Sequence, residues 1–346
     1  MLIAGAGMAG LVAAARAREL GAQPVVLEKG DRAGGSMVLS SGVIWRYRSM
    51  EEFRRQCPGG DEALQRVLVE RLEDGLDWLE SLGLGPTERE TANPLTLGRR
   101  YDPRALTDTL ARAAGDVRFG EPFAGARRPV VLATGGFGAR LARERALPLR
   151  ANPWSEGDGL DYARAAGAAA TAAMGEFYGR AMPAPPARWS EREYVDHAQL
   201  YGRFARVVDE SGAQIDHDPS DWSENGLVQE IAARGGTAWY EVPRAALDRL
   251  TPYGTVRQVI ERARRAGAEI RDATEMVSVH VVAAVTHTIG GIRVDERARV
   301  LDESGQPLDG VYAAGVDGGG VATGGYASGL AQALVLGLIA AEETAK

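Results

Sequence analysis

Three glycines close to the amino terminus have the spacing of a phosphate-binding turn. The segment Gly5-Ala6-Gly7-Met8-Ala9-Gly10 places glycine at the first, third and sixth positions. In such a turn the first glycine permits a tight bend, the second lets a pyrophosphate approach the backbone, and the third lets a helix pack closely on a strand. Glu28 follows at the distance where an acidic residue accepts hydrogen bonds from a ribose. The pattern predicts that the chain binds a dinucleotide.

The elements that must position this turn can be recognised on either side of it. Residues 1–4 form a short apolar stretch, typical of a buried strand. Residues 11–20 are rich in alanine, which favours a helix, and Gly21 ends that stretch. Residues 23–27 read as a second buried strand that ends at Glu28. The order strand, glycine turn, helix, strand favours a parallel βαβ unit over an isolated glycine-rich turn, and the amino end of its helix would face the phosphates.

The residues after Glu28 indicate which dinucleotide is bound. Lys29 comes next, followed by Gly34-Gly35-Ser36 and then Ser40-Ser41-Gly42. This order resembles the flavoprotein subunits of fumarate reductase and succinate dehydrogenase, a family that also contains ketosteroid dehydrogenases. The resemblance implies FAD as the cofactor, with the glycine–serine loop alongside its pyrophosphate and isoalloxazine. It also implies non-covalent binding, because the first histidine of this chain is His197, far from the loop where covalently flavinylated members carry theirs.

Three later segments agree with the same family. Residues 129–137 end in Thr-Gly-Gly, residues 152–160 contain Glu-Gly-Asp-Gly, and residues 286–329 contain the remaining glycine motifs. Val316 stands where the family has an acidic residue, and Asp317 is adjacent and suited to replace it. The resemblance assigns the following residues to FAD: Gly5, Gly7, Met8, Ala9, Gly10, Glu28, Lys29, Gly34, Gly35, Ser36, Ser40, Ser41, Gly42, Ala133, Thr134, Gly135, Asp158, Gly315, Asp317, Ser328, Gly329 and Leu330.

The order of the motifs implies the architecture. Cofactor motifs occupy both ends of the chain, and the middle carries none. We therefore expect an α/β fold, with a Rossmann-like FAD-binding domain of the glutathione-reductase βαβ type and an inserted α+β capping domain. The expected boundaries are residues 1–150 and 276–346 for the FAD-binding domain and residues 151–275 for the capping domain. A last helix from Ser328 to Thr344 would point its amino end at the pyrimidine edge of the flavin.

Two positions argue against a dicarboxylate substrate. Alignment with the fumarate reductases places Tyr326 where their carboxylate-binding arginine stands, and Trp222 where their proton-donating arginine stands. A pair of carboxylates requires charge-assisted donors, which arginine supplies in a fixed fork. His287, within the His-Thr-x-Gly-Gly motif, remains.

Tyr326 instead resembles a tyrosine of the ketosteroid dehydrogenases. In that family a tyrosine hydroxyl and a nearby backbone amide polarise a ketone oxygen, which acidifies the neighbouring C–H bond. The resemblance implies Tyr326, His287 and Tyr178 as catalytic residues, with Arg180 beside them. Structural roles for these residues remain open. Tyr326 could only pack at a domain cleft, and Tyr178 and Arg180 could lie at the rim of the substrate pocket. Trp222 and Trp239 could be core residues rather than walls of that pocket.

Three functions are compatible with these residues. The first is an FAD-dependent dehydrogenase or ene-reductase that acts on a CH–CH bond next to a carbonyl of a small, apolar, non-dicarboxylate substrate. The second is a flavin-dependent oxidase or isomerase with the same cofactor pocket. The third is a flavin-binding protein without catalysis. No second dinucleotide motif is present, so the electron acceptor is open.

The composition of the chain argues against several kinds of partner and site. Asp and Glu total 47 against 40 for Lys and Arg, which gives a net charge of −7 and argues against nucleic acid. The single cysteine, Cys57, and four scattered histidines argue against a disulfide or a metal site. No apolar run is long enough for a membrane span, so we expect a cytoplasmic protein. The chain is also shorter than its family between Val117 and Pro129 and between Ala273 and Val285, with abrupt joins expected at Ala124–Arg128 and Thr274–Val277.

Overall fold

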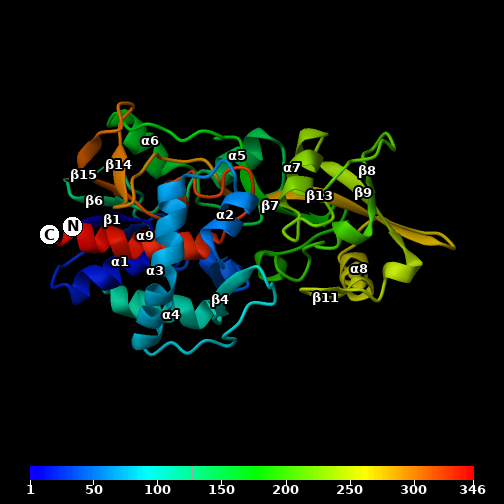
Figure 1. Ribbon diagram of the computed structural model, residues 1–346, viewed down its shortest axis with the longest axis horizontal. Helices are drawn as coiled ribbons and strands as arrows, with labels where there is room; N and C mark the ends of the chain where they lie inside the picture. The colour runs from blue at the N-terminus through cyan, green and yellow to red at the C-terminus, as the bar shows by residue number, and fades with distance from the viewer. Residues whose placement is uncertain (126–127) are drawn as a thin grey trace. The chain divides into compact units, whose positions relative to one another are not determined.

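The computed structural model describes residues 1–125 and 128–346, which divide into two compact units. Unit 1 comprises Met1–Arg140, Asn152–Glu176 and His287–Lys346, and unit 2 comprises Leu141–Ala151 and Phe177–Thr286. Both ends of the chain therefore contribute to unit 1 (Figure 1). The abrupt join expected at Ala124–Arg128 includes residues 126 and 127, which lie outside the described part.

A six-stranded sheet forms the centre of unit 1. Its order is β14-β15-β6-β1-β2-β5, and every neighbouring pair is parallel except β14 with β15. The strands are β1 (Leu2–Ala4), β2 (Val25–Glu28), β5 (Val117–Phe119), β6 (Val130–Leu132), β14 (Arg299–Leu301) and β15 (Pro307–Ala313). A parallel sheet next to a glycine-turn helix confirms the predicted α/β class.

Helices pack around α1 (Met8–Glu19), which contacts β1, β2 and β6. On its flanks lie α4 (Pro103–Ala114) and α9 (Gly329–Thr344), and α9 also contacts α3 (Glu62–Ser81). Figure 1 shows α9 running beside α1. Both α1 and α9 are buried on nearly all sides. Their sequences are therefore small and apolar around most of the helix and lack the amphipathic pattern of a surface helix.

The two predicted helices next to the cofactor motifs are present. The first starts at Met8 rather than Leu11, because Met8, Ala9 and Gly10 already form its first turn. The last is α9, and the hydroxyl of Ser328 caps it by accepting the backbone amide of Ala331 at 3.2 Å. The remaining elements of unit 1 are β3 (Val43–Tyr47) paired antiparallel with β4 (Thr96–Arg100), and the helices α2 (Met50–Gln56), α6 (Asp158–Ala165), η1 (Met37–Leu39) and η5 (Gly315–Asp317).

Unit 2 is built on an antiparallel sheet with the order β12-β13-β9-β8, and β7 also pairs with β13. These strands are β7 (Phe177–Pro183), β8 (Arg206–Val208), β9 (Thr237–Pro243), β12 (Ile270–Asp272) and β13 (Met276–Thr288), whose last two residues belong to unit 1. The helix α7 (Asn225–Ala233) packs on β7 and β9. The other elements are β10 (Leu250–Thr251), β11 (Gly254–Thr255), α8 (Val256–Arg265), η2 (Glu191–Glu193), η3 (Gly202–Phe204) and η4 (Arg244–Ala246), while α5 (Gly138–Glu144) crosses the boundary between the units.

Among the helices of the described residues, none combines the length and the apolar character that a bilayer span requires.

Candidate functional site

The turn between β1 and α1 has the backbone of a phosphate-binding loop. Gly5 has a φ of +104°, and a Cβ there would lie 2.2 Å from the carbonyl oxygen of Ala133. A Cβ on Gly10 would lie 1.9 Å from the carbonyl oxygen of Gly5, a distance that no side chain tolerates. At Gly7, by contrast, no described atom beyond its chain neighbours lies within 4 Å of the position that a Cβ would take. The loop is therefore tight at Gly5 and Gly10 and open at Gly7, as a bound pyrophosphate requires.

The amino end of α1 supplies hydrogen-bond donors to the same open space. Gly7 is the N-cap of α1 and, within the described chain, no side chain caps this end. The first turn also carries no acidic side chain, so the positive end of the helix dipole is not neutralised there. The amides of Met8 and Ala9 are thus donors suited to a phosphate.

Glu28 joins this loop to the segment that follows β2. Its carboxylate accepts the backbone amide of Ala6 at 2.8 Å and that of Gly30 at 2.7 Å, and its side chain is buried. Sequence reasoning predicted a ribose contact for Glu28, but not this backbone role. Each carboxylate oxygen has a second lone pair, so the two roles are compatible.

The glycine–serine loop lies directly against the phosphate-binding turn. The amide of Gly34 donates to the carbonyl oxygen of Ala6 at 2.8 Å, and a Cβ on Gly35 would lie 3.2 Å from the Cα of Gly7. The hydroxyl of Ser36 accepts the backbone amide of Asn152 at 3.2 Å. The structure therefore brings two of the predicted FAD motifs into contact, and it adds Asn152, which sequence reasoning did not single out.

Ser40 and Gly42 shape the turn that leads into β3. The Ser40 hydroxyl donates to the carbonyl oxygen of Met37 at 2.7 Å and accepts the amide of Gly42 at 3.1 Å. Ser41, between them, is partly exposed. A cofactor contact of these three residues stays a prediction.

Two predicted cofactor residues pair with each other in unit 1. The ammonium group of Lys29 lies 2.8 Å from a carboxylate oxygen of Asp158, and both side chains are partly exposed. Lys29 follows β2 and Asp158 opens α6, so this ion pair joins the end of a strand to the start of a helix. Part of the role of each residue is therefore structural.

Asp317 clamps the turn that follows β6. Its buried carboxylate accepts the backbone amide of Gly136 at 2.9 Å and the hydroxyl of Thr134 at 3.1 Å, and it also accepts the Thr134 amide. Burial raises the pKa of Asp317, while the bonds from Thr134 and Gly136 oppose that rise. The sequence suggested Asp317 as the replacement for the acidic residue that contacts the flavin in this family. In the structure, Asp317 already holds the Thr-Gly-Gly motif in place.

Gly315 lies between Asp317 and the first glycine motif, Gly5–Gly10. It has a φ of +64°, and a Cβ on it would lie 3.0 Å from the Cβ of Ala9. Gln332 of α9 donates its side-chain amide to the carbonyl oxygen of Gly315 at 2.8 Å and also to that of Gly318. The motifs from the two ends of the chain therefore meet around the start of α1.

His287 lies against the amino end of α9. A Cβ on Gly329, the first residue of that helix, would lie 3.1 Å from the Nε2 atom of His287. The Nδ1 atom lies 3.1 Å from the carbonyl oxygen of Thr288. Burial lowers the pKa of His287, and the bond to Thr288 opposes this, so the ring is neutral at neutral pH.

Tyr326 stands two residues before the cap of α9. Its backbone carbonyl accepts the hydroxyl of Tyr47 at 2.7 Å, and its ring centroid lies 5.3 Å from that of Trp45. Tyr326, His287, Ser328 and Gly329 are thus gathered at one end of one helix. Trp45 and Tyr47 were missed by sequence reasoning, although two aromatic residues with the spacing of one strand face after a Ser-Gly turn are a signal for such packing.

Tyr178 and Arg180 lie on β7 of unit 2, where both are buried. The guanidinium carbon of Arg180 lies 4.8 Å from the ring centroid of Tyr178, and the guanidinium donates to the carbonyl oxygen of Ser223. The predicted catalytic residues are therefore divided between the units, with Tyr326 and His287 in unit 1. Trp239 is buried in unit 2, where its ring stacks with that of His280 and the guanidinium carbon of Arg271 lies 3.5 Å from its centroid.

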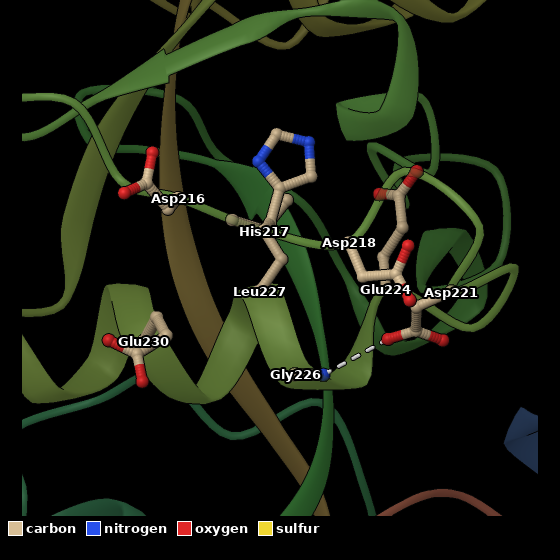
Figure 2. A pocket seen from close by; sticks show the side chains of 8 residues that line it. All are labelled: Asp216, His217, Asp218, Asp221, Glu224, Gly226, Leu227 and Glu230. Carbon is tan, nitrogen blue, oxygen red and sulfur yellow. Dashed lines mark hydrogen bonds between the residues drawn. The ribbon is translucent and has the colours of Figure 1, made fainter. Parts of the chain in front are cut away.

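Unit 2 also contains a pocket of about 240 Å³ that none of the predicted site residues lines. Its buried acidic member is Glu224, the N-cap of α7, which has a φ of +51° and whose pKa burial raises to about 7. Figure 2 shows Asp218, Asp221 and Glu224 close together on one side of the pocket. Across the described residues, no group of three or more His, Cys, Asp or Glu side chains is arranged to hold a metal ion. The lining residues are Asp216, His217, Asp218, Asp221, Glu224, Gly226, Leu227 and Glu230.

Comparison with known proteins identifies the fold and cofactor. The sequence model of the FAD binding domain family FAD_binding_2 matches residues 1–125 and 111–329. The probable fumarate reductase Ifc3 of Shewanella frigidimarina is 24% identical, with 100% of this chain and 74% of that protein aligned. That alignment runs over 464 positions, so the relative carries segments that this chain lacks.

The solved structures that resemble the whole chain include two ketosteroid dehydrogenases. One is 3-ketosteroid-Δ4-(5α)-dehydrogenase from Rhodococcus jostii RHA1 in complex with 4-androstene-3,17-dione, with a TM-score of 0.73, 19% identity, and 100% of this chain and 96% of that chain covered. The other is 3-ketosteroid Δ1-dehydrogenase from Sterolibacterium denitrificans in complex with 1,4-androstadiene-3,17-dione, with a TM-score of 0.74, 15% identity, and 99% and 98% covered. Such likeness shows a shared fold. The turn at Gly5–Gly10, called the glycine cradle below, and the amino end of α1, which no described side chain caps, agree with the family match. The chain belongs to the FAD binding domain family and is an FAD-dependent oxidoreductase.

Proposed function

We propose that the chain exchanges hydride with FAD at a CH–CH bond next to a carbonyl group in an apolar substrate, either by dehydrogenating that bond or by reducing the corresponding C=C bond. The observation that carries this proposal is the pair of residues at the amino end of α9, which are Tyr326 and His287. A phenol donates one neutral hydrogen bond, and a histidine with a lowered pKa adds no positive charge at neutral pH. This end of α9 is therefore suited to a ketone oxygen rather than to a pair of carboxylates.

In this proposal each residue has one task. Bound FAD supplies hydride exchange at flavin N5. Tyr326 donates its hydroxyl to the carbonyl oxygen of the substrate and so acidifies the adjacent C–H bond. A base accepts that proton, a role in which Tyr178 stays a prediction, and His287 orients the substrate from the start of α9. The proposed FAD contacts are the glycine cradle at Gly5–Gly10, the loops that contact it, and the first amides of α9.

The names of related proteins bear on this choice in two ways. The curated relative is a probable fumarate reductase, which would favour a dicarboxylate. The two solved structures are ketosteroid dehydrogenases bound to cyclic ketones, which favour an enone. The resemblance, which aligns Tyr326 with the carboxylate-binding arginine of the fumarate reductases, supports the enone.

Anaerobic mixing of the FAD-loaded protein tests the proposal. Oxidised protein is mixed with 4-androstene-3,17-dione, with cyclohexanone or with succinate, and dithionite-reduced protein with the same steroid, with cyclohexenone or with fumarate. The visible absorbance of the flavin reports each reaction. We expect at least one ketone or enone to exchange electrons with the flavin and neither dicarboxylate to do so. Electron exchange with fumarate that is faster than with any enone would overturn the proposal.

Substitution of the phenol tests the proposed role of Tyr326. Tyr326→Phe should lower the rate with the active ketone by about 100-fold, because loss of one donor to a developing oxyanion has a cost of that order. FAD occupancy should not change. Tyr162→Phe is the matched control, since Tyr162 belongs to the same unit and packs with Phe123. An unchanged rate in Tyr326→Phe would refute the assignment.

A further inference from the structure

The loop that carries Tyr326 is held along most of its length by backbone hydrogen bonds within unit 1. The carbonyl oxygen of Gly320 accepts the amide of Asp61 at 2.9 Å, and that of Thr323 accepts the amide of Gly59 at 3.2 Å. The amide of Gly324 donates to the carboxylate of Glu176 at 2.8 Å. The loop before Gly325 is therefore fixed at several successive points.

A buried glutamine strengthens the same attachment. The side-chain amide of Gln65, on α3, donates at 3.0 Å to the carbonyl oxygens of both Cys57 and Val321. Arg54, on α2, donates to the other end of that amide at 3.1 Å. A Cβ on Gly325 would lie 1.9 Å from the carbonyl oxygen of Gln56, so the loop and the last residue of α2 are in direct backbone contact.

Tyr326 lies between these attachments and the cap of α9 at Ser328. Its carbonyl oxygen accepts the hydroxyl of Tyr47 at 2.7 Å. Tyr47 is itself fully buried, and its ring packs against Trp45 at 5.3 Å and Phe53 at 5.1 Å between centroids. The donor that holds the Tyr326 carbonyl is thus rigid, because rings on both sides fix its orientation.

The side chain of Tyr326 is held by the same strand. Trp45 lies on the same face of β3 as Tyr47, two residues earlier, and its ring meets that of Tyr326 at 5.3 Å and 63°. Strand β3 therefore contacts Tyr326 twice, once at the main chain and once at the ring. These contacts fix both the peptide plane that sets the direction of Cβ and the side-chain torsion.

We infer that Tyr47 is a positioning residue for Tyr326, which its hydroxyl orients through the main-chain carbonyl. The inference rests on the proposed function, in which the phenol of Tyr326 must meet a carbonyl oxygen. A rotation of about 10° at the Cα atom displaces a phenol oxygen by about 1 Å, and a misplacement of that size lowers a reaction rate by up to about 100-fold. Trp45 supports the same orientation from the side of the ring.

A double-mutant cycle separates positioning from general destabilisation. With 4-androstene-3,17-dione as the probe, Tyr47→Phe should lower the limiting rate of flavin reduction by about 10-fold and change the apparent dissociation constant by less than about 2-fold. In a Tyr326→Phe background the same substitution should have no further effect, because Tyr47 acts through the phenol. Equal losses in both backgrounds would overturn the inference. If Tyr47→Phe does not retain FAD, Trp45→Phe enters the same cycle with the same expectation.

A second measurement requires no substrate. Hydrogen–deuterium exchange of the FAD-loaded protein should show faster exchange in Tyr47→Phe for peptides that cover residues 326–328, and unchanged exchange for residues 57–60. Unchanged exchange at residues 326–328 would overturn the inference, whatever the activity. The two proposals fail separately: an unaltered rate in Tyr326→Phe refutes the proposed function, whereas a slow Tyr326→Phe with a fast Tyr47→Phe refutes only the positioning role.

Discussion

The carboxylate of Asp317 accepts the backbone amide of Gly136 at 2.9 Å, although 181 positions separate the two residues in the chain. Asp317 belongs to the turn after β15 and Gly136 to the turn after β6, and these strands are parallel neighbours in the central sheet. The carboxyl ends of adjacent parallel strands meet at one sheet edge, where ligands of such folds bind. One buried side chain therefore sets the spacing of two turns that both belong to predicted FAD motifs.

Asp317→Asn should weaken FAD binding. Both oxygens of the carboxylate accept donors from Thr134 or Gly136, so the amide group of asparagine would face a backbone N–H. An unsatisfied buried donor costs about 1–3 kcal/mol, which corresponds to at least about a 5-fold loss in affinity if the turn opens. The dissociation constant of FAD, measured by quenching of flavin fluorescence, checks this. Asp309→Asn, at an exposed position of β15, is the control and should bind FAD normally.

Gly7→Ala and Gly10→Ala should fail in different ways. A methyl group at Gly7 meets no described atom beyond its chain neighbours, so the fold should remain intact while FAD affinity falls by about 10-fold or more, because the methyl group occupies the space of the pyrophosphate. A methyl group at Gly10 would overlap the carbonyl oxygen of Gly5, and we expect that variant to unfold readily. Thermal melts of the apo protein and FAD titrations separate the two results. Gly85→Ala is the control, since Gly85 also has open space around it; equal FAD affinity of Gly7→Ala and Gly85→Ala would contradict the assigned site.

Stability should depend on pH through Glu224. Burial raises its pKa from 4.5 to about 7, and Arg180 and Arg203 oppose that rise. Because the folded-state pKa exceeds the unfolded-state value, this group favours the fold at low pH, and that contribution is lost as pH rises from about 4.5 to about 7. Glu224→Gln should therefore raise the free energy of unfolding at pH 8, by up to about 3 kcal/mol, and change it little at pH 4.5.

Urea denaturation at pH 8 and at pH 4.5, followed by a spectroscopic signal from unit 2, measures this difference in the free energy of unfolding. Glu230→Gln, at an exposed position of the same pocket, is the matched control and should change neither value appreciably. If Glu224→Gln lowers stability at pH 8, attraction between the Glu224 carboxylate and Arg180 outweighs the cost of burying the charge.

Tyr326→Arg should introduce affinity for a dicarboxylate. Arginine offers a planar pair of donors to a carboxylate, whereas the phenol offers one neutral donor. We expect succinate to perturb the flavin spectrum of this variant at concentrations at which it leaves the unaltered protein and Tyr326→Phe unperturbed. No difference among the three proteins would mean that residue 326 does not face the substrate.

Local signals in the sequence were sufficient for the elements that bind the cofactor. The glycine spacing from Gly5 to Gly10 predicted the turn and its helix, because the requirements of such a turn act over a few residues, and the last helix was expected from Ser328, one residue before α9 begins. The contact of Tyr47 with Tyr326 was not predictable in this way, since 279 positions separate them. The same holds for the acidic pocket of unit 2, whose buried Glu224 has an altered pKa only because the folded chain removes it from water.

The central sheet also has a consequence for the synthesis of the protein. Strand β6 pairs with β15 and α9 packs against α1, so β6 and α1 receive these two neighbours only from residues that are synthesised after unit 2. All of unit 2 leaves the ribosome before residues 287–346 do. During translation unit 2 can therefore complete its own sheet while the edge of β6 that pairs with β15 and the side of α1 that contacts α9 are still uncovered, and exposed surface of this kind is where a nascent chain is prone to aggregate.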